Sequence, residues 1–187
     1  MALMRALRVG IFVGGQGTRM GGVAKGLLEH EGQTLVGRWL KTCAACEVEA
    51  VLVGDHPAYR ALGHPILADA RVPGPLGGLL ALLESTRTPH VVAVACDMPF
   101  VSAALLTRLL KRPLAPIVAA RSGDRWEPFF ARYEVAAILP QARALAASPR
   151  HALQPLFTAA TELVLSPGER LQLRDWDTPA DRGLTER

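Results

Sequence analysis

The sequence predicts an α/β fold: a three-layer, doubly wound and mostly parallel sheet with an antiparallel excursion in its C-terminal third. Two observations predict it. Short, continuous apolar runs recur and end at Gly or Asp, and helical candidates with an apolar stripe lie between them. Continuous apolar strands are typical of parallel sheets that helices cover on both faces. A chain of 187 residues, 50% of them hydrophobic, can bury one core, so we expect a single domain.

The apolar runs give the predicted strands, which lie at 7–13, 50–53, 65–68, 91–96 and 116–120. Amphipathic stretches between them predict helices at 34–45, 76–83 and 102–110. Thr34 is a candidate N-cap of the first of these helices. In open α/β sheets, ligands bind beyond the carboxyl ends of the strands. We therefore expect a site at one edge, near Gly14, Gly54, Asp69 and Asp97.

The pattern changes after residue 120. Residues 119–126 suggest a strand and a turn leading into 127–133, which predicts an antiparallel pair. A helix is predicted at 135–147, with a kink or break at Pro140, because proline removes a helical hydrogen bond. The tail, at 161–165 and 171–177, is predicted to form a strand, a turn and a return to the sheet.

Composition excludes several classes of protein. The 21 basic and 17 acidic residues leave a net charge of +4, but the basic residues form no stripe interleaved with aromatics, so we expect no nucleic-acid binding. No apolar run is long enough for a membrane span and no leader pattern opens the chain, which favours a cytoplasmic protein without membrane association. Three Cys argue against a disulfide scaffold, and the pair at 43 and 46 is expected to be buried and structural.

A glycine-rich loop follows the first predicted strand and carries the sharpest local signal. Five of the nine residues at 14–22 are Gly, and Arg19 and Lys25 add positive charge. Such a loop brings backbone N–H groups close to anionic oxygens, which predicts phosphate binding. The spacing excludes a P-loop, because Lys25 is followed by Gly26, and a dinucleotide fingerprint, because Met20 stands where its last Gly belongs.

Further motifs follow this loop in order. They are Lys25-Gly26-Leu27-Leu28, Asp69 with the 73–78 turn, Cys96-Asp97-Met98-Pro99, Glu127-Pro128-Phe129-Phe130 and Asp175-Trp176-Asp177-Thr178-Pro179. The ordered set resembles the molybdenum cofactor guanylyltransferase family of Rossmann-like nucleotidyltransferases. The resemblance implies Mg²⁺-dependent transfer of GMP from GTP to the phosphate of the molybdopterin cofactor, with release of pyrophosphate. It also implies a nucleotide-binding half at about 1–100 and an acceptor-binding half at about 101–187.

The resemblance assigns roles to individual residues. Arg19, Lys25 and Asp97 are the expected catalytic residues, with Arg19 and Lys25 neutralising phosphate charge. Asp97 and Asp177 are the expected Mg²⁺ ligands, an interpretation in keeping with the preference of Mg²⁺ for carboxylates and phosphates. Trp126 and 127–130 are expected at the acceptor. The expected nucleotide-binding residues are Phe12, Val13, Gly14, Gly15, Gly17, Thr18, Lys25, Gly54, Asp69, Gly77 and Asp97.

Alternatives remain open. The chain departs from the family pattern at Ala24, where an Asp is usual, at Gly54, where an Asn is frequent, and at Trp176, where a small aliphatic residue is expected. A cytidylyltransferase of the same cofactor, a sugar-phosphate nucleotidyltransferase and a catalytically silent nucleotide-binding homologue are the competing hypotheses. Expected partners are GTP and molybdopterin, and proteins of molybdenum insertion or molybdoenzyme maturation are further candidates.

Overall fold

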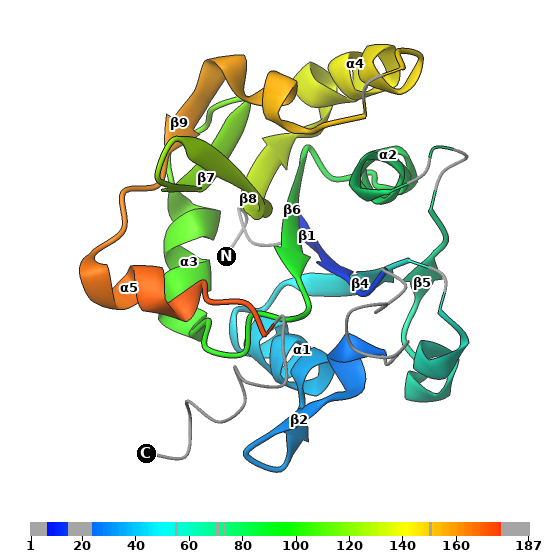
Figure 1. Cartoon of the computed structure of the whole chain (residues 1–187), viewed down its shortest axis with the longest axis vertical. Coiled ribbons are helices and arrows are strands. Elements are labelled where there is room, and N and C mark those ends of the chain that lie inside the picture. The colour runs from blue at the N-terminus through cyan, green and yellow to red at the C-terminus, as the bar shows by residue number, and fades with distance from the viewer. Residues whose placement is uncertain are drawn as a thin grey trace.

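The computed structural model describes residues 7–14, 24–54, 56–69, 72, 74–149 and 151–176. Its central sheet has the strand order β5-β4-β1-β6-β8-β7-β9 (Figure 1). The strands are β1 (Leu7–Phe12), β4 (Glu49–Val53), β5 (Ile66–Leu67), β6 (His90–Ala95), β7 (Ile117–Ser122), β8 (Arg125–Glu134) and β9 (Ala160–Glu162). Strand β8 runs antiparallel to both of its neighbours, whereas the other pairings are parallel. The predicted mostly parallel sheet with an antiparallel excursion is confirmed.

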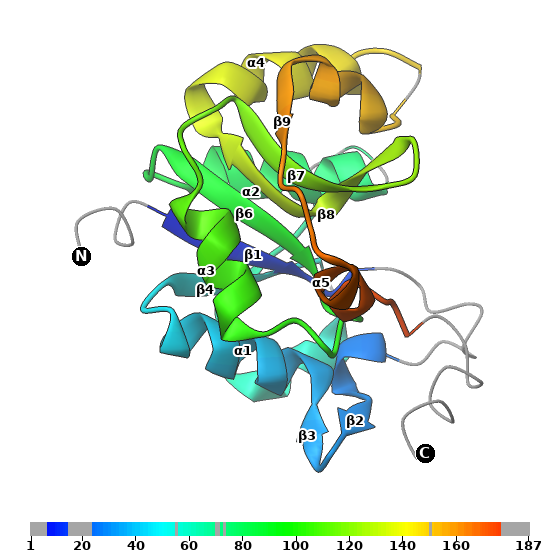
Figure 2. The same ribbon diagram turned by 90° about the vertical axis from the view of Figure 1, so that its left-hand side faces the viewer.

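Helices cover both faces of this sheet. They are α1 (Leu35–Ala45), α2 (Pro75–Ser85), α3 (Ala103–Lys111), α4 (Val135–Ala146) and α5 (Pro167–Gln172). Figure 2 shows α2 and α4 on one side of the sheet and α1 and α3 on the other. Shorter elements are the 3-10 turns η3 (Lys25–Leu27), η4 (Pro57–Leu62) and η5 (Gln154–Ala159), and the hairpin β2 (Glu29–His30) and β3 (Gln33–Thr34).

Alternation of side chains along the central strands divides the core into two clusters. In β6, Val92 and Val94 pack into the cluster that holds α1 and α3, while Val91 and Ala93 pack into the cluster that holds α2 and α4. Successive strand residues point to opposite faces, so a run of apolar residues supplies both clusters. None of the described helices is long and apolar enough to cross a lipid bilayer.

The helices predicted at 34–45, 76–83 and 102–110 are confirmed as α1, α2 and α3. Thr34 caps α1, since its hydroxyl accepts a hydrogen bond from the Gly37 N–H at 3.0 Å. Helix α4 continues through Pro140, so a break at this residue is wrong. Both Pro140 and Ala136 are exposed, and solvent can therefore take the carbonyl that proline leaves without a donor. Ser102 caps α3 in the same way as Thr34 caps α1.

The tail departs most from the prediction. The strand predicted at 161–165 is confirmed in part as β9, which has three residues. The return to the sheet predicted at 171–177 is wrong over the described residues, 171–176, which contain no strand. Residues 167–172 form α5 instead, because Ser166 and Glu169 make a capping box that satisfies the first turn. The β2–β3 hairpin is absent from the sequence prediction; its turn places Glu31 and Gly32 at positive φ.

Candidate active site at the carboxyl ends of the central strands

The carboxyl ends of β1, β4 and β6 meet at one edge of the sheet. The N–H groups of Val13 and Gly14 both donate to the Val53 carbonyl oxygen, at 2.9 and 3.2 Å, and the Cys96 N–H donates to the Phe12 carbonyl oxygen at 3.1 Å. These bonds bring the start of the glycine-rich loop beside the segment that follows β6. The predicted gathering of Gly14, Gly54 and Asp97 at this edge is confirmed.

Gly54 is a glycine for a steric reason. Its φ is +122°, and a Cβ at this position would lie 2.5 Å from the Gly14 nitrogen. A side chain such as Asn would therefore push the glycine-rich loop away from β4. The departure from the family pattern at this position allows the two backbones to touch.

Asp69 faces the same edge from the end of β5. A Cβ on Gly14 would lie 3.8 Å from Asp69 Oδ2, and a Cβ on Gly78 would lie 3.2 Å from Asp69 Oδ1 and 2.8 Å from Phe12 Cε1. The exposed Asp69 carboxyl group thus lies between the loop and the first turn of α2. Gly78 is missing from the predicted binding residues. The predicted binding residue Gly77 is its neighbour in the first turn of α2, and both glycines are buried.

Lys25 and Asp97 form an ion pair at the centre of the site. Lys25 Nζ lies 3.1 Å from Asp97 Oδ2, and the two side chains are only 22% and 17% exposed. Lys25 begins η3 and Asp97 lies two residues beyond the end of β6, so the fold joins residues that are 72 positions apart. Partial burial strengthens the interaction between their charges. An ammonium and a carboxylate held together in this way suit a ligand that carries phosphate groups and a divalent cation.

The neighbouring thiol is not available as a nucleophile. Cys96 is buried, and burial together with the negative charge of Asp97 raises the pKa of its thiol. Burial likewise raises the pKa of the Cys43 thiol to about 12. Because the thiolate is the reactive form, both groups stay inert at neutral pH. The burial of Cys43 and Cys46 agrees with the prediction that this pair is structural.

The C-terminal tail returns to the site. The backbone N–H of Trp176 donates to the Asp97 backbone carbonyl oxygen at 2.9 Å. The indole of Trp176 is buried and packs edge-on against the His30 ring, with ring centroids 5.0 Å apart. The large side chain at this position therefore anchors the tail beside Asp97. The predicted site residues Gly15, Gly17, Thr18, Arg19 and Asp177 lie outside the described residues.

The segment predicted to lie at the acceptor makes two aromatic contacts. Phe129 packs against Phe12 with ring centroids 4.5 Å apart, while Trp126 stacks on Phe157 at 5.7 Å. Glu127, between these aromatics, is half-buried, and burial raises the pKa of its carboxyl group. Within the described ranges, no group of three or more His, Cys, Asp or Glu side chains gathers as a closed metal site.

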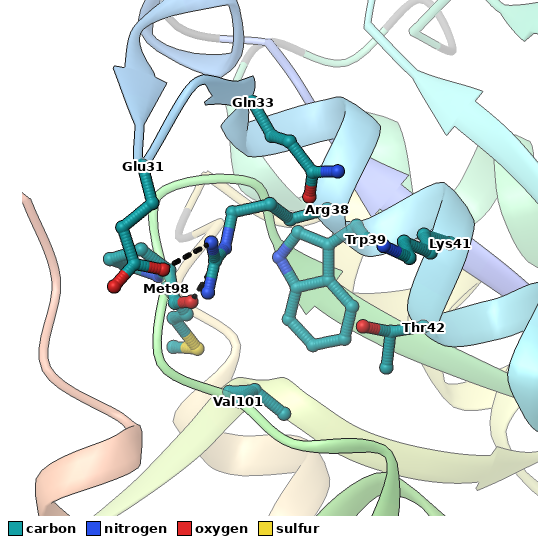
Figure 3. Close-up of a pocket in the computed structure, with 9 residues that line it drawn as sticks. Glu31, Gln33, Arg38, Trp39, Lys41, Thr42, Met98 and Val101 are labelled. Atoms are coloured by element: carbon teal, nitrogen blue, oxygen red, sulfur yellow. Dashed lines mark hydrogen bonds and ion pairs between the residues drawn. The ribbon is translucent and has the colours of Figure 1, made fainter.

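A cavity of about 430 Å³ lies behind the loop that follows Asp97 (Figure 3). Arg38 spans it: the guanidinium donates to the Pro99 carbonyl oxygen at 3.2 Å and to Glu31 at 3.0 Å. The β2–β3 hairpin, helix α1 and the 98–101 loop are thereby held together. Trp39 and Met98 form apolar walls of this cavity. Met98 and Pro99 of its wall directly follow Asp97 in the sequence, so the Arg38 contact with Pro99 ties α1 to the loop that begins at this carboxylate.

Comparisons with known proteins agree with this geometry. A family model described as "MobA-like NTP transferase domain" matches residues 9–162. A molybdenum cofactor guanylyltransferase of Pseudomonas putida (strain GB-1) is 31% identical over 175 residues, which cover 90% of this chain and 92% of the relative. One from Pseudomonas paraeruginosa (strain DSM 24068 / PA7) is 34% identical and covers 82% of both. The fold is similar to that of molybdopterin-guanine dinucleotide biosynthesis protein A from Archaeoglobus fulgidus, with a TM-score of 0.79, 20% identity and 95% coverage of both chains.

Proposed function

We propose that this chain transfers GMP from GTP to the phosphate of the molybdopterin cofactor. The chain belongs to the MobA-like NTP transferase family and is a nucleotidyltransferase of molybdenum cofactor biosynthesis. In this reaction an oxygen of the acceptor phosphate attacks the α-phosphorus of GTP. A new P–O bond forms, the bond from the α-phosphorus to the bridging oxygen breaks, and pyrophosphate leaves with that oxygen. The observation that carries the proposal is the Lys25–Asp97 pair, with Asp97 following β6 at the sheet edge where Cys96 bonds to Phe12 of β1.

Positioning and charge neutralisation supply most of the catalysis in such a transfer. We propose that Gly15, Gly17 and Thr18 cradle the triphosphate through backbone N–H groups. Gly14, whose N–H donates to the Val53 carbonyl oxygen, lets the backbone approach the nucleotide closely in this proposal. Lys25 and Arg19 neutralise the leaving pyrophosphate and the charge that develops on the phosphates in this proposal. Phe12, Val13, Gly54, Asp69 and Gly77 border the nucleoside in this proposal.

Magnesium fits the residues around Asp97. Mg²⁺ commonly takes one or two carboxylates with phosphate oxygens and water, and Asp97 offers a partly exposed carboxylate beside a cation that binds phosphate. Asp97 would hold the ion, with Asp177 as the second carboxylate. When bound, the ion supplies positive charge to the phosphate oxygens.

Calorimetric titration with GTP and with CTP, each with Mg²⁺, tests the nucleotide assignment. We expect GTP to bind at least about tenfold more tightly than CTP, a difference of about 1.4 kcal/mol. Equal or tighter binding of CTP would support the cytidylyltransferase alternative. Binding of GTP without pyrophosphate release in the presence of molybdopterin would support a silent nucleotide-binding protein.

A further inference from the structure

The turn that carries Lys25 has no cap of its own. Ala24 precedes η3 in an extended conformation, and its methyl group accepts no hydrogen bond. Inside the turn, the Leu27 N–H donates to the Ala24 carbonyl oxygen at 2.8 Å, and the Leu28 N–H donates to the Lys25 carbonyl oxygen at 3.0 Å. The first N–H groups of any helical turn lack partners within it, and a side chain at the N-cap usually supplies one. The Gly26 N–H therefore needs an acceptor from elsewhere.

Tyr59 supplies that acceptor from a distant segment. Its hydroxyl oxygen accepts a hydrogen bond from the Gly26 N–H at 2.9 Å, across 33 positions of sequence. Tyr59 belongs to η4 and is fully buried, so water does not compete for this bond. Burial and the negative charge of nearby Asp97 both raise the pKa of Tyr59, which keeps the hydroxyl protonated at neutral pH.

The contact is also close enough to explain the glycine after Lys25. A Cβ at position 26 would lie 2.9 Å from the Tyr59 hydroxyl oxygen and 2.5 Å from Val36 Cγ2. Any side chain there would push η3 away from Tyr59 and from α1. Gly26 and Tyr59 together fix the backbone from which the Lys25 side chain extends.

We infer that Tyr59 is a positioning residue for Lys25: it replaces the missing N-cap of η3 and holds the turn where the ammonium reaches Asp97. This inference rests on the proposed function, in which Lys25 contacts the phosphates of GTP. A lysine side chain has four flexible bonds, so its reach depends on a fixed starting point in the backbone. Without the Tyr59 hydroxyl, a buried N–H loses its partner and the turn populates other conformations.

The experiment compares Tyr59→Phe with Tyr133→Phe. Tyr59→Phe keeps the buried ring and removes only the acceptor, and we expect the Kd for GTP to rise about fivefold or more because fewer molecules hold the competent turn. Tyr133 is equally buried, and its hydroxyl donates to the Pro128 carbonyl oxygen at 2.7 Å, away from η3. Tyr133→Phe is expected to lower Tm and leave the Kd for GTP unchanged.

The same measurement in a Lys25→Ala background separates positioning from general destabilisation. If Tyr59 acts through Lys25, Tyr59→Phe causes no further loss of GTP affinity once Lys25 is absent. An equal loss in both backgrounds, or no loss in the wild-type background, would overturn the inference. If Tyr59→Phe does not fold, Gly26→Ala is used in its place. We expect Gly26→Ala to weaken GTP binding by the same factor when Lys25 is present, and to cause no further loss of GTP affinity in the Lys25→Ala background.

Amide hydrogen exchange at Gly26 gives a readout that does not depend on GTP. We expect strong protection in the wild type and much faster exchange in Tyr59→Phe, with the exchange of core strand amides unchanged. If the wild-type protein binds no GTP, the proposed function fails, while this exchange difference still supports Tyr59 as the anchor of the turn. Unchanged exchange at Gly26 would contradict the anchor itself.

Discussion

At the scale of single residues, the site depends on two charges that lie 3.1 Å apart and are mostly buried. Each of the two side chains suits a different part of the proposed ligand. A phosphate draws Lys25, and a divalent cation draws Asp97. On binding of Mg²⁺ and GTP, the Lys25–Asp97 pair would be replaced by two pairs of opposite charge, Lys25 with phosphate and Asp97 with Mg²⁺.

Asp97→Asn tests the proposed role of Asp97 as a ligand of Mg²⁺. The amide keeps the size of the side chain but binds Mg²⁺ weakly, so we expect pyrophosphate release to fall by roughly 100-fold or more at saturating GTP. GTP affinity measured without Mg²⁺ should not fall, because Lys25 loses a competing carboxylate. A variant that releases pyrophosphate at the wild-type rate would remove Asp97 from the chemistry. Circular dichroism of Asp97→Asn serves as the folding control.

Gly54 allows a second prediction at this scale. Gly54→Ala combines a positive φ with a Cβ only 2.5 Å from the Gly14 nitrogen, so we expect a loss of about 2 kcal/mol or more in unfolding free energy and weaker GTP binding. Gly63→Ala is the matched control. Gly63 has a φ of +66° but nothing within 4 Å of its Cβ position, so only backbone strain of about 1 kcal/mol is expected. Similar losses in both variants, with GTP affinity intact, would show that the close approach is unimportant.

At the scale of elements, one buried arginine joins β8 to the end of α3. Arg132 is 1% exposed, and its guanidinium donates to the carbonyl oxygens of Leu109, Leu110, Arg112 and Pro113 at 2.7 to 3.4 Å. The last carbonyls of a helix lack donors and carry partial negative charge. Arg132 satisfies them from outside the helix. Burial lowers the pKa of this guanidinium, which nevertheless stays charged.

Arg132→Met is expected to lower the free energy of unfolding by about 3 kcal/mol, because it leaves several helix-end carbonyls without partners. Arg132→Lys should lie between the wild type and Arg132→Met, since one ammonium cannot reach all four oxygens. Denaturant unfolding of the three proteins measures the series. Equal stability of Arg132→Met and the wild type would mean that these hydrogen bonds contribute nothing net.

Helices with local caps could be predicted from the sequence, whereas contacts between distant segments could not. Thr34 and the apolar periodicity predicted α1, because a cap and its helix are neighbours in the chain. The capping box at Ser166 and Glu169 is the same kind of local signal, but the sequence prediction did not use it and placed a turn between 165 and 171, where α5 begins. Tyr59 and Arg132 gave no local signal, since their partners lie on distant segments. Such contacts depend on the assembled fold and not on any nearby pattern.

At the scale of the whole molecule, the alternation of apolar strands and helices predicted which strand ends would meet. The pairing of β1 with β4 and β6 brings together Gly14, Gly54 and Asp97, as the doubly wound pattern requires. What the pattern could not give was the packing between them. The close approach of Gly54 to Gly14, and of Gly78 to Phe12 and Asp69, depends on how the elements pack in the folded chain. Composition and periodicity carry no information about these distances.

The pH dependence of stability is a property of the whole fold that His90 helps to set. Burial, together with the positive charge of Arg132, lowers the pKa of His90 from 6.5, although Glu134 acts in the opposite direction. Below about pH 6.5 the unfolded chain binds a proton that the folded chain resists, so stability is expected to fall as pH decreases through this range. His90→Gln should reduce that slope, whereas His64→Gln, at an exposed position, should leave it unchanged. Equal slopes in the wild type and in His90→Gln would contradict this assignment.

The central claim is that this edge of the sheet transfers GMP to the molybdopterin cofactor. Its most direct test is pyrophosphate release by the wild-type protein with Mg²⁺ and molybdopterin, with GTP and CTP supplied in parallel. The account predicts release with GTP that depends on molybdopterin and falls by roughly 100-fold or more in Asp97→Asn. Release that is faster with CTP, or absent with both nucleotides while GTP still binds, would contradict it.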